Sequence, residues 1–122
     1  MYGRPGRMHL ELLKYDPKDE TPKLRERLDI LTIAHTVMSE HQSKIEKGFR
    51  PHGNDVRAIF ETHIARSPKK YSEPEKTRLS AVVDGVIGEV IRRRFEQKFV
   101  SRYLEGVKSA IDELNALLIG RK

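Results

Sequence analysis

The sequence predicts an all-α protein, a small helical bundle that forms one domain. Apolar residues recur at intervals of three and four along most of the chain, which is the spacing of one helix face. No useful length of chain alternates with the period of two that a strand requires. With 122 residues and 37% hydrophobic content, the chain is long enough for one core and too short for two stable domains.

Two segments divide the chain. Residues 1–7 form a flexible basic arm, because Gly3, Pro5 and Gly6 break any regular structure and the arm carries Arg4 and Arg7. Residues 8–122 form a single all-α domain, which opens with a short helix around Leu10 to Leu13.

The first long helix begins at Thr21, the expected N-cap, with Pro22 in the first helical position. It runs for about six turns to Lys47-Gly48, where glycine supplies the C-cap. The next helix is capped by Asn54 or Asp55 and ends at Ser67-Pro68. One of its faces holds Val56, Ile59, Phe60, His63 and Ile64.

A long C-terminal amphipathic helix starts at Ser72 and Glu75, which form a capping box. Its apolar seam steps by alternating four and three residues from Leu79 to Leu118 and is interrupted only by Arg93 and Gln97. As one helix, residues 73–119 would span about 70 Å, too long for a compact bundle. We therefore expect either a split near residues 92–106 or a projecting helix that pairs with a second chain.

The last part of the seam predicts a homodimer or higher oligomer, with packing against residues 24–45 of the same chain as the alternative. The predicted self-association residues are Val100, Leu104, Val107, Ile111, Leu114 and Leu118. Gly85 and Gly88 each cost about 1 kcal/mol relative to alanine inside a helix. The close approach of another helix backbone, or alternatively a local bend, accounts for them.

The formal net charge of +6 favours nucleic acid, an acidic protein or an anionic surface as partner. Arg94, Lys98 and Arg102 stand four residues apart and form a stripe that can follow phosphates, widened by Arg92 and Arg93. The alternative is a solvated face whose arginine stems cover apolar surface. Lys69 and Lys70 belong to a second basic cluster, and Arg4 and Arg7 of the arm are a third candidate. No base-reading pattern is visible, so binding to the sugar-phosphate backbone without sequence preference is expected.

Enzyme motifs with strong signatures are missing, among them the phosphate-binding glycine loop, the dinucleotide fingerprint and the zinc-protease helix. One weaker pair of candidate catalytic residues remains. Arg57 and His63 have five residues between them, a spacing that resembles the Arg-to-His motif of the HEPN helical-bundle ribonucleases. That resemblance implies RNA cleavage by both side chains at a dimer interface. Ala58 departs from it, since the family usually has a polar residue there, and the alternative places His63 on the apolar face and Arg57 on the surface.

No metal or cofactor is predicted. Cysteine is absent, which excludes disulfides and thiolate ligands, and the histidines are scattered over several elements. No segment approaches the roughly 20 apolar residues of a membrane span or resembles a signal peptide. We therefore expect a cytoplasmic protein, or one packaged in a particle assembled inside the cell, and neither secretion nor membrane binding.

Two classes of function fit these observations best. The first is a non-enzymatic, nucleic-acid-associated protein such as a nucleoid-type factor, a virus-encoded coating protein or a subunit of a nucleoprotein complex. The second is a protein-interaction adaptor or inhibitor with a basic face for an acidic partner. The high charged fraction of 34%, with only four Asn and Gln, is a bias typical of thermophilic sources.

Overall fold

The structure is a computed structural model that describes residues 15–92 and 99–121. These residues form five helices and no strand, which confirms the all-α prediction. The helices are α2 (Thr21–Glu40), α3 (Gln42–Glu46), α4 (Gly53–Arg66), α5 (Glu73–Arg92) and α6 (Phe99–Ile119). Arg4, Arg7 and the expected helix around Leu10 lie outside the described residues. None of the described helices combines the length and apolar character that a bilayer crossing requires.

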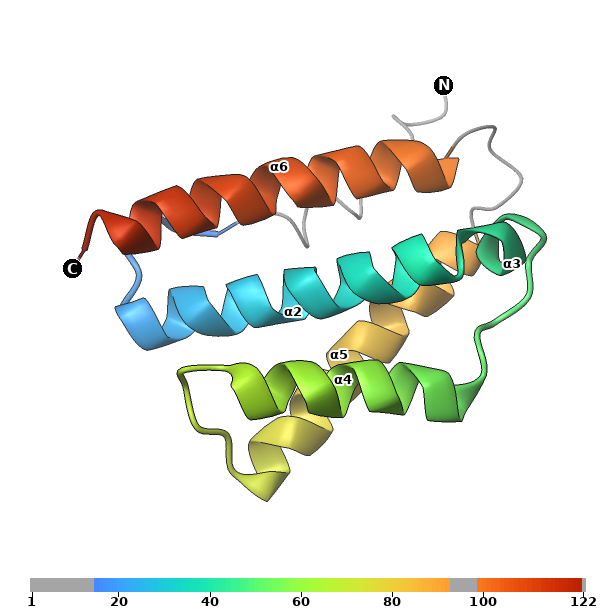
Figure 1. Cartoon of the computed structure of the whole chain (residues 1–122). Coiled ribbons are helices and arrows are strands. Elements are labelled where there is room, and N and C mark those ends of the chain that lie inside the picture. Colours follow the sequence, from blue (N-terminus) through green and yellow to red (C-terminus); the bar gives the residue numbers. More distant parts are fainter. Residues whose placement is uncertain (1–14, 93–98, 122) are drawn as a thin grey trace.

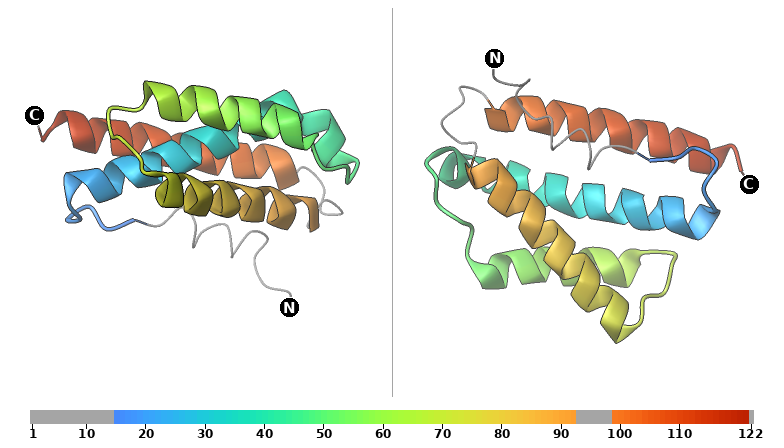
Figure 2. Two further views of the ribbon diagram at one scale, coloured as in Figure 1. Left: turned by 90° about the horizontal axis from the view of Figure 1, so that it is seen from below. Right: turned by 180° about the vertical axis from the view of Figure 1, so that it is seen from behind.

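Helix α2 lies at the centre of the bundle. Helix α6 runs antiparallel along one side of it, α4 lies on the other side, and α5 crosses both α2 and α4 obliquely (Figures 1 and 2). Two buried clusters meet on neighbouring faces of α2, one shared with α6 through Leu31 and Met38, the other shared with α4 and α5 through Ile33 and Val37. A helix that packs on two sides needs a wide apolar surface. The apolar residues of α2 therefore cover a broad part of the helix surface rather than a narrow stripe.

The first long helix ends earlier than predicted. Its backbone leaves helical geometry at His41, so α2 stops at Glu40 and a short α3 follows, turned toward α5 and α6. The predicted C-cap is confirmed. Gly48 has φ 85°, its N–H donates to the Ile45 carbonyl, and the Phe49 N–H donates to the Lys44 carbonyl at 2.8 Å. These are the bonds of a helix end closed by a residue in the left-handed conformation, which favours glycine.

Helix starts agree only in part with the predictions. Thr21, the predicted N-cap of the first long helix, is its first helical residue, and Glu20 holds the N-cap position. The capping box of α5 is confirmed, because the Ser72 N–H donates to Glu75 Oε1 at 3.0 Å and the Glu75 N–H donates to Ser72 Oγ at 3.4 Å. The prediction of Asn54 or Asp55 as the α4 N-cap was wrong. His52 holds that position, and its Nδ1 accepts from the Asn54 N–H at 3.2 Å.

The C-terminal helix is split within the expected region. Helix α5 ends at Arg92 and α6 begins at Phe99, and the two run in different directions (Figure 1). Gly106 lies inside α6 and does not interrupt it. The seam residues of α5, Leu79, Val83, Val86 and Val90, are all buried.

The close approach of another helix backbone, predicted for the two glycines of α5, was wrong. A Cβ atom added at Gly85 would have no neighbour within 4 Å, so no helix in the described part of the chain approaches it closely. At Gly88 the close neighbour is the Arg50 side chain and not a helix backbone.

Candidate functional site

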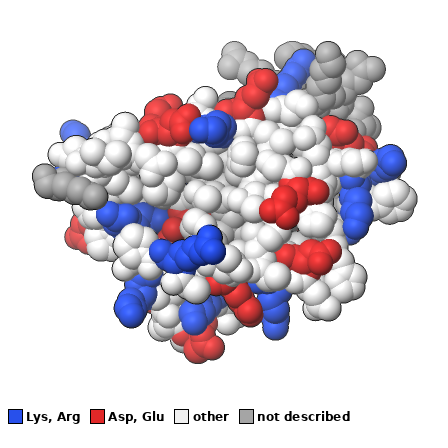
Figure 3. All heavy atoms as spheres, viewed as in Figure 1, with Lys and Arg blue, Asp and Glu red and all other residues white. Residues whose placement is uncertain are grey.

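The net positive charge of this protein comes mostly from outside the residues that the structure describes. Seven of the 24 Lys and Arg residues, but only Glu11 and Glu96 of the 18 acidic ones, fall in residues 1–14, 93–98 and 122. Those 21 residues therefore carry +5 of the net +6, and the described body is nearly neutral. In Figure 3, basic and acidic side chains intermingle across the visible face. The excess of cations over anions therefore comes mostly from these segments, and on the described residues basic groups matter locally rather than as a net charge.

Two members of the predicted phosphate-binding stripe fall within the described residues. Arg92 ends α5 and Arg102 lies in the first turn of α6, so both are at the same end of the bundle, and both are exposed (Figure 1). Arg92 Nη2 donates to Glu89 Oε2 at 2.8 Å, which partly neutralises its charge. Arg93, Arg94 and Lys98 lie outside the described residues, between these two.

The second basic cluster is interleaved with carboxylates. Lys69 Nζ lies 3.6 Å from Glu26 and 3.5 Å from Glu75, and 4.7 Å from the centre of the Tyr71 ring. Arg78 also pairs with Glu26. Lys70 is exposed. A phosphate would have to displace existing partners at Lys69, so Lys70 is the better placed of the two predicted lysines.

The candidate catalytic pair is not brought together. Arg57 and His63 are six residues apart on α4, which places them about 120° apart around the helix axis. Arg57 is exposed and borders the groove between α4 and α5. His63 is half-buried, and its Nε2 lies 2.8 Å from Asp29 Oδ1 on α2. The alternative that Arg57 is a surface residue is confirmed, while His63 is held by a carboxylate rather than by apolar packing alone.

Asp29 is the buried polar centre that sequence reasoning missed. It is 5% exposed, and its carboxylate accepts hydrogen bonds from His63, from Ser67 Oγ at 2.8 Å and from the Tyr71 hydroxyl at 2.5 Å. Burial raises the pKa of this carboxyl, but the hydrogen bonds from the three partners lower it by more, so the pKa lies below its ordinary value. Burial and the bond to Asp29 raise the pKa of Tyr71.

This cluster joins three parts of the chain rather than forming a nucleophilic triad. In a triad the serine hydroxyl donates to the histidine, and the carboxylate holds the other imidazole nitrogen. Here Ser67 and His63 both bind the carboxylate, so no base activates the hydroxyl. The only sequence signal was one acidic residue inside the apolar run Leu28 to Ile33. Among the described residues, no three His, Asp or Glu side chains converge to hold a metal ion.

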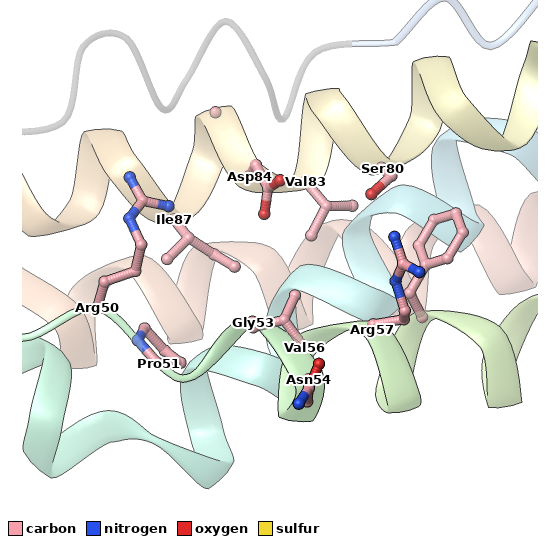
Figure 4. Close-up of a pocket in the computed structure, with 12 residues that line it drawn as sticks. Arg50, Pro51, Gly53, Asn54, Val56, Arg57, Ser80, Val83, Asp84 and Ile87 are labelled. Atoms are coloured by element: carbon pink, nitrogen blue, oxygen red, sulfur yellow. The ribbon is translucent and has the colours of Figure 1, made fainter.

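A groove lies between α4 and α5. One part of it, about 740 Å³ in volume, is bordered by Arg50 and Arg57 from the α4 side and by Asp84, Gly85 and Ile87 from α5 (Figure 4). A second part, about 850 Å³, continues toward Lys70 and Lys76. Sequence reasoning missed Arg50, which precedes α4 in a loop.

The predicted self-association seam is used inside the chain. Val100, Val107, Leu114 and Leu118 are buried in the cluster that α6 shares with α2, as the intrachain alternative expected. Leu104 and Ile111 pack against the same cluster and stay half-buried. Self-association through these six residues stays a prediction, and these two are the members with accessible surface.

Comparison with protein-family models, with characterised proteins and with solved structures gave no match for this chain.

Proposed function

We propose that this protein is a non-enzymatic, nucleic-acid-associated helical protein that binds the sugar-phosphate backbone at the end of the bundle where α5 ends and α6 begins. The observation that supports the proposal most is the separation of charge, a nearly neutral body with +5 held in short segments. One of these segments, residues 93–98, stands between the exposed Arg92 and Arg102.

Arginine suits this role. Its planar guanidinium has five N–H donors, so Arg92 can keep its bond to Glu89 and still donate to a phosphate. The mixed charge of the face shown in Figure 3 supports a local contact and not a wrapped one. Arg93, Arg94, Lys98 and Arg102 are the further residues proposed to contact phosphates, and Arg4 and Arg7 of the N-terminal segment are a second point of attachment.

The test is fluorescence anisotropy of labelled double-stranded DNA, single-stranded DNA and single-stranded RNA, titrated with the full chain at several salt concentrations. The test variant is Arg92→Ala/Arg93→Ala/Arg94→Ala. The matched control removes three exposed cations at the opposite end of the bundle, Lys18→Ala/Lys23→Ala/Arg66→Ala. Both variants lose the same formal charge, so a difference between them reports position rather than net charge.

We expect wild type to bind with an affinity that falls as salt rises, and the test variant to have a smaller salt slope than the control variant. Equal slopes for the two variants would overturn the proposed location. Lack of wild-type binding to all three nucleic acids would overturn the function and favour an acidic protein partner.

A further inference from the structure

The guanidinium of Arg50 lies directly on helix α5 at Gly88. A Cβ atom built on Gly88 would lie 3.0 Å from Arg50 Nη2, closer than nine in ten real Cβ contacts. Gly88 itself is buried, while Arg50 is exposed. In Figure 4 the Arg50 side chain extends from its loop across the groove toward α5. Glycine at position 88 therefore allows the end of this side chain to come so close to the helix.

No described carboxylate neutralises Arg50. The structure gives it no ion pair and no side-chain hydrogen bond among residues 15–92 and 99–121. Asp84 is the one acidic residue among those bordering this part of the groove, and it makes no ion pair with Arg50. A guanidinium held against a helix without an anion keeps its donors available for one.

Arg50 continues the surface on which Arg92 lies. Asp84, Gly88 and Arg92 follow one another at four-residue steps on α5, so they share one face, about one turn apart. The Arg50 guanidinium lies against Gly88, so it is about one helical turn from the position of Arg92 on α5. Because Arg92 shares its charge with Glu89 and Arg50 does not, Arg50 is the less neutralised of the two cations.

We infer that Arg50 makes a phosphate contact on the same surface as Arg92, and that Gly88 positions it there. This inference rests on the proposed nucleic-acid association, and it extends the contact surface from α5 to the loop before α4. The partner it specifies is the phosphodiester backbone, because adjacent cations on one face match regularly spaced phosphates and no base-reading group accompanies them.

The experiment compares four full-length proteins in the anisotropy assay: wild type, Arg50→Ala, Gly88→Ala and the control Arg66→Ala. Arg66 is an exposed arginine at the far end of α4, so its removal changes the net charge equally. Loss of one phosphate contact lowers the salt slope by about 0.9, so the ratio of affinities between about 50 mM and about 200 mM salt falls about threefold. We expect that fall for Arg50→Ala and an unchanged ratio for Arg66→Ala.

Gly88→Ala keeps every charge but displaces the guanidinium. We expect its affinity to lie between those of wild type and Arg50→Ala, with a thermal midpoint at or above that of wild type because the clash is with the end of a flexible exposed side chain. An affinity of Gly88→Ala equal to that of wild type would overturn the role of Gly88.

A salt slope for Arg50→Ala equal to that of Arg66→Ala would overturn the inference about Arg50. If the Arg92/Arg93/Arg94 variant still shows a reduced salt slope in that case, the proposed function stands. Lack of wild-type binding overturns both.

Discussion

Replacing Asp29 by asparagine should destabilise the protein more than any other charge-neutralising change in α2. The substitution keeps the size of the side chain but replaces one acceptor oxygen by a donor NH₂. His63, Ser67 and Tyr71 all donate to this carboxylate, so the NH₂ group takes the place of an acceptor for at least one of them. That partner loses its bond to a charged oxygen and has to change its tautomer or turn its hydroxyl to accept instead. The remaining bonds become neutral ones, which are about half as strong as charge-assisted bonds.

The size of the effect follows from these contacts. Losing one hydrogen bond to a charged group costs about 1.5–3 kcal/mol, and weakening the other two adds about 1 kcal/mol, so we expect a loss of about 3 kcal/mol. A small domain with a free energy of unfolding of about 5–15 kcal/mol stays folded after such a change. Urea denaturation followed by far-UV circular dichroism at neutral pH measures it.

The matched control is Asp112→Asn. Asp112 is an exposed carboxylate on α6 that pairs with Lys108 at 3.0 Å, both side chains being 61% exposed. Exposed pairs contribute about 0–1 kcal/mol, so this variant should be close to wild type. If Asp29→Asn costs no more than Asp112→Asn, the reasoning that this network stabilises the junction of α2, α4 and α5 is wrong.

Acid titration gives an independent check on the same carboxylate. The pKa of Asp29 in the folded state lies below 3.8, its ordinary value, so the folded state binds fewer protons than the unfolded state in this range. The stabilisation is therefore complete above pH 3.8 and is lost as the pH falls through the folded-state pKa. The difference between wild type and Asp29→Asn should narrow over that window. A difference that widens on acidification would show that the ionised form is not the stabilising one.

Three further predictions concern packing and helix ends. Gly85→Ala should raise the free energy of unfolding by up to about 1 kcal/mol, since the added methyl meets nothing within 4 Å, and a lower thermal midpoint would contradict this. Leu114→Ala, in the fully buried part of α6, should cost about 2–5 kcal/mol in chemical denaturation, and a cost below 1 kcal/mol would show that α6 does not pack on α2 as described. Ser72→Ala removes the capping box of α5 and should cost about 1 kcal/mol, whereas no change would mean that the box contributes nothing to stability.

The sequence predicted those parts of the fold that depend on local chemistry. The capping box at Ser72 and Glu75 and the glycine at position 48 were both found from residue type and spacing, because each acts within a few residues. The seam of α6 was found for the same reason. The surface against which this seam packs could not be predicted. A repeat of apolar residues indicates that one helix face is buried, but it does not indicate whether the same chain or a second chain buries it.

The features that escaped prediction depend on contacts distant in the sequence. Asp29 meets Ser67 and Tyr71 across 38 and 42 residues, and only the fold brings them together. Arg50 contacts the helix at Gly88, 38 positions later in the chain, and no local pattern indicates that contact. The close partner of Gly88 was therefore a side chain from a loop, which helical spacing alone cannot indicate.

Nuclear magnetic resonance titration of the ¹⁵N-labelled protein with a short oligonucleotide tests the proposed binding surface most directly, and the chain of 14.1 kDa is well suited to it. We expect the shifts of backbone amides and arginine Nε–H groups to cluster at Arg50, Arg92 and Arg102, and to disappear as the salt concentration is raised. Shifts that cluster instead at Lys18 and Lys23, or no shifts at saturating oligonucleotide, would contradict it.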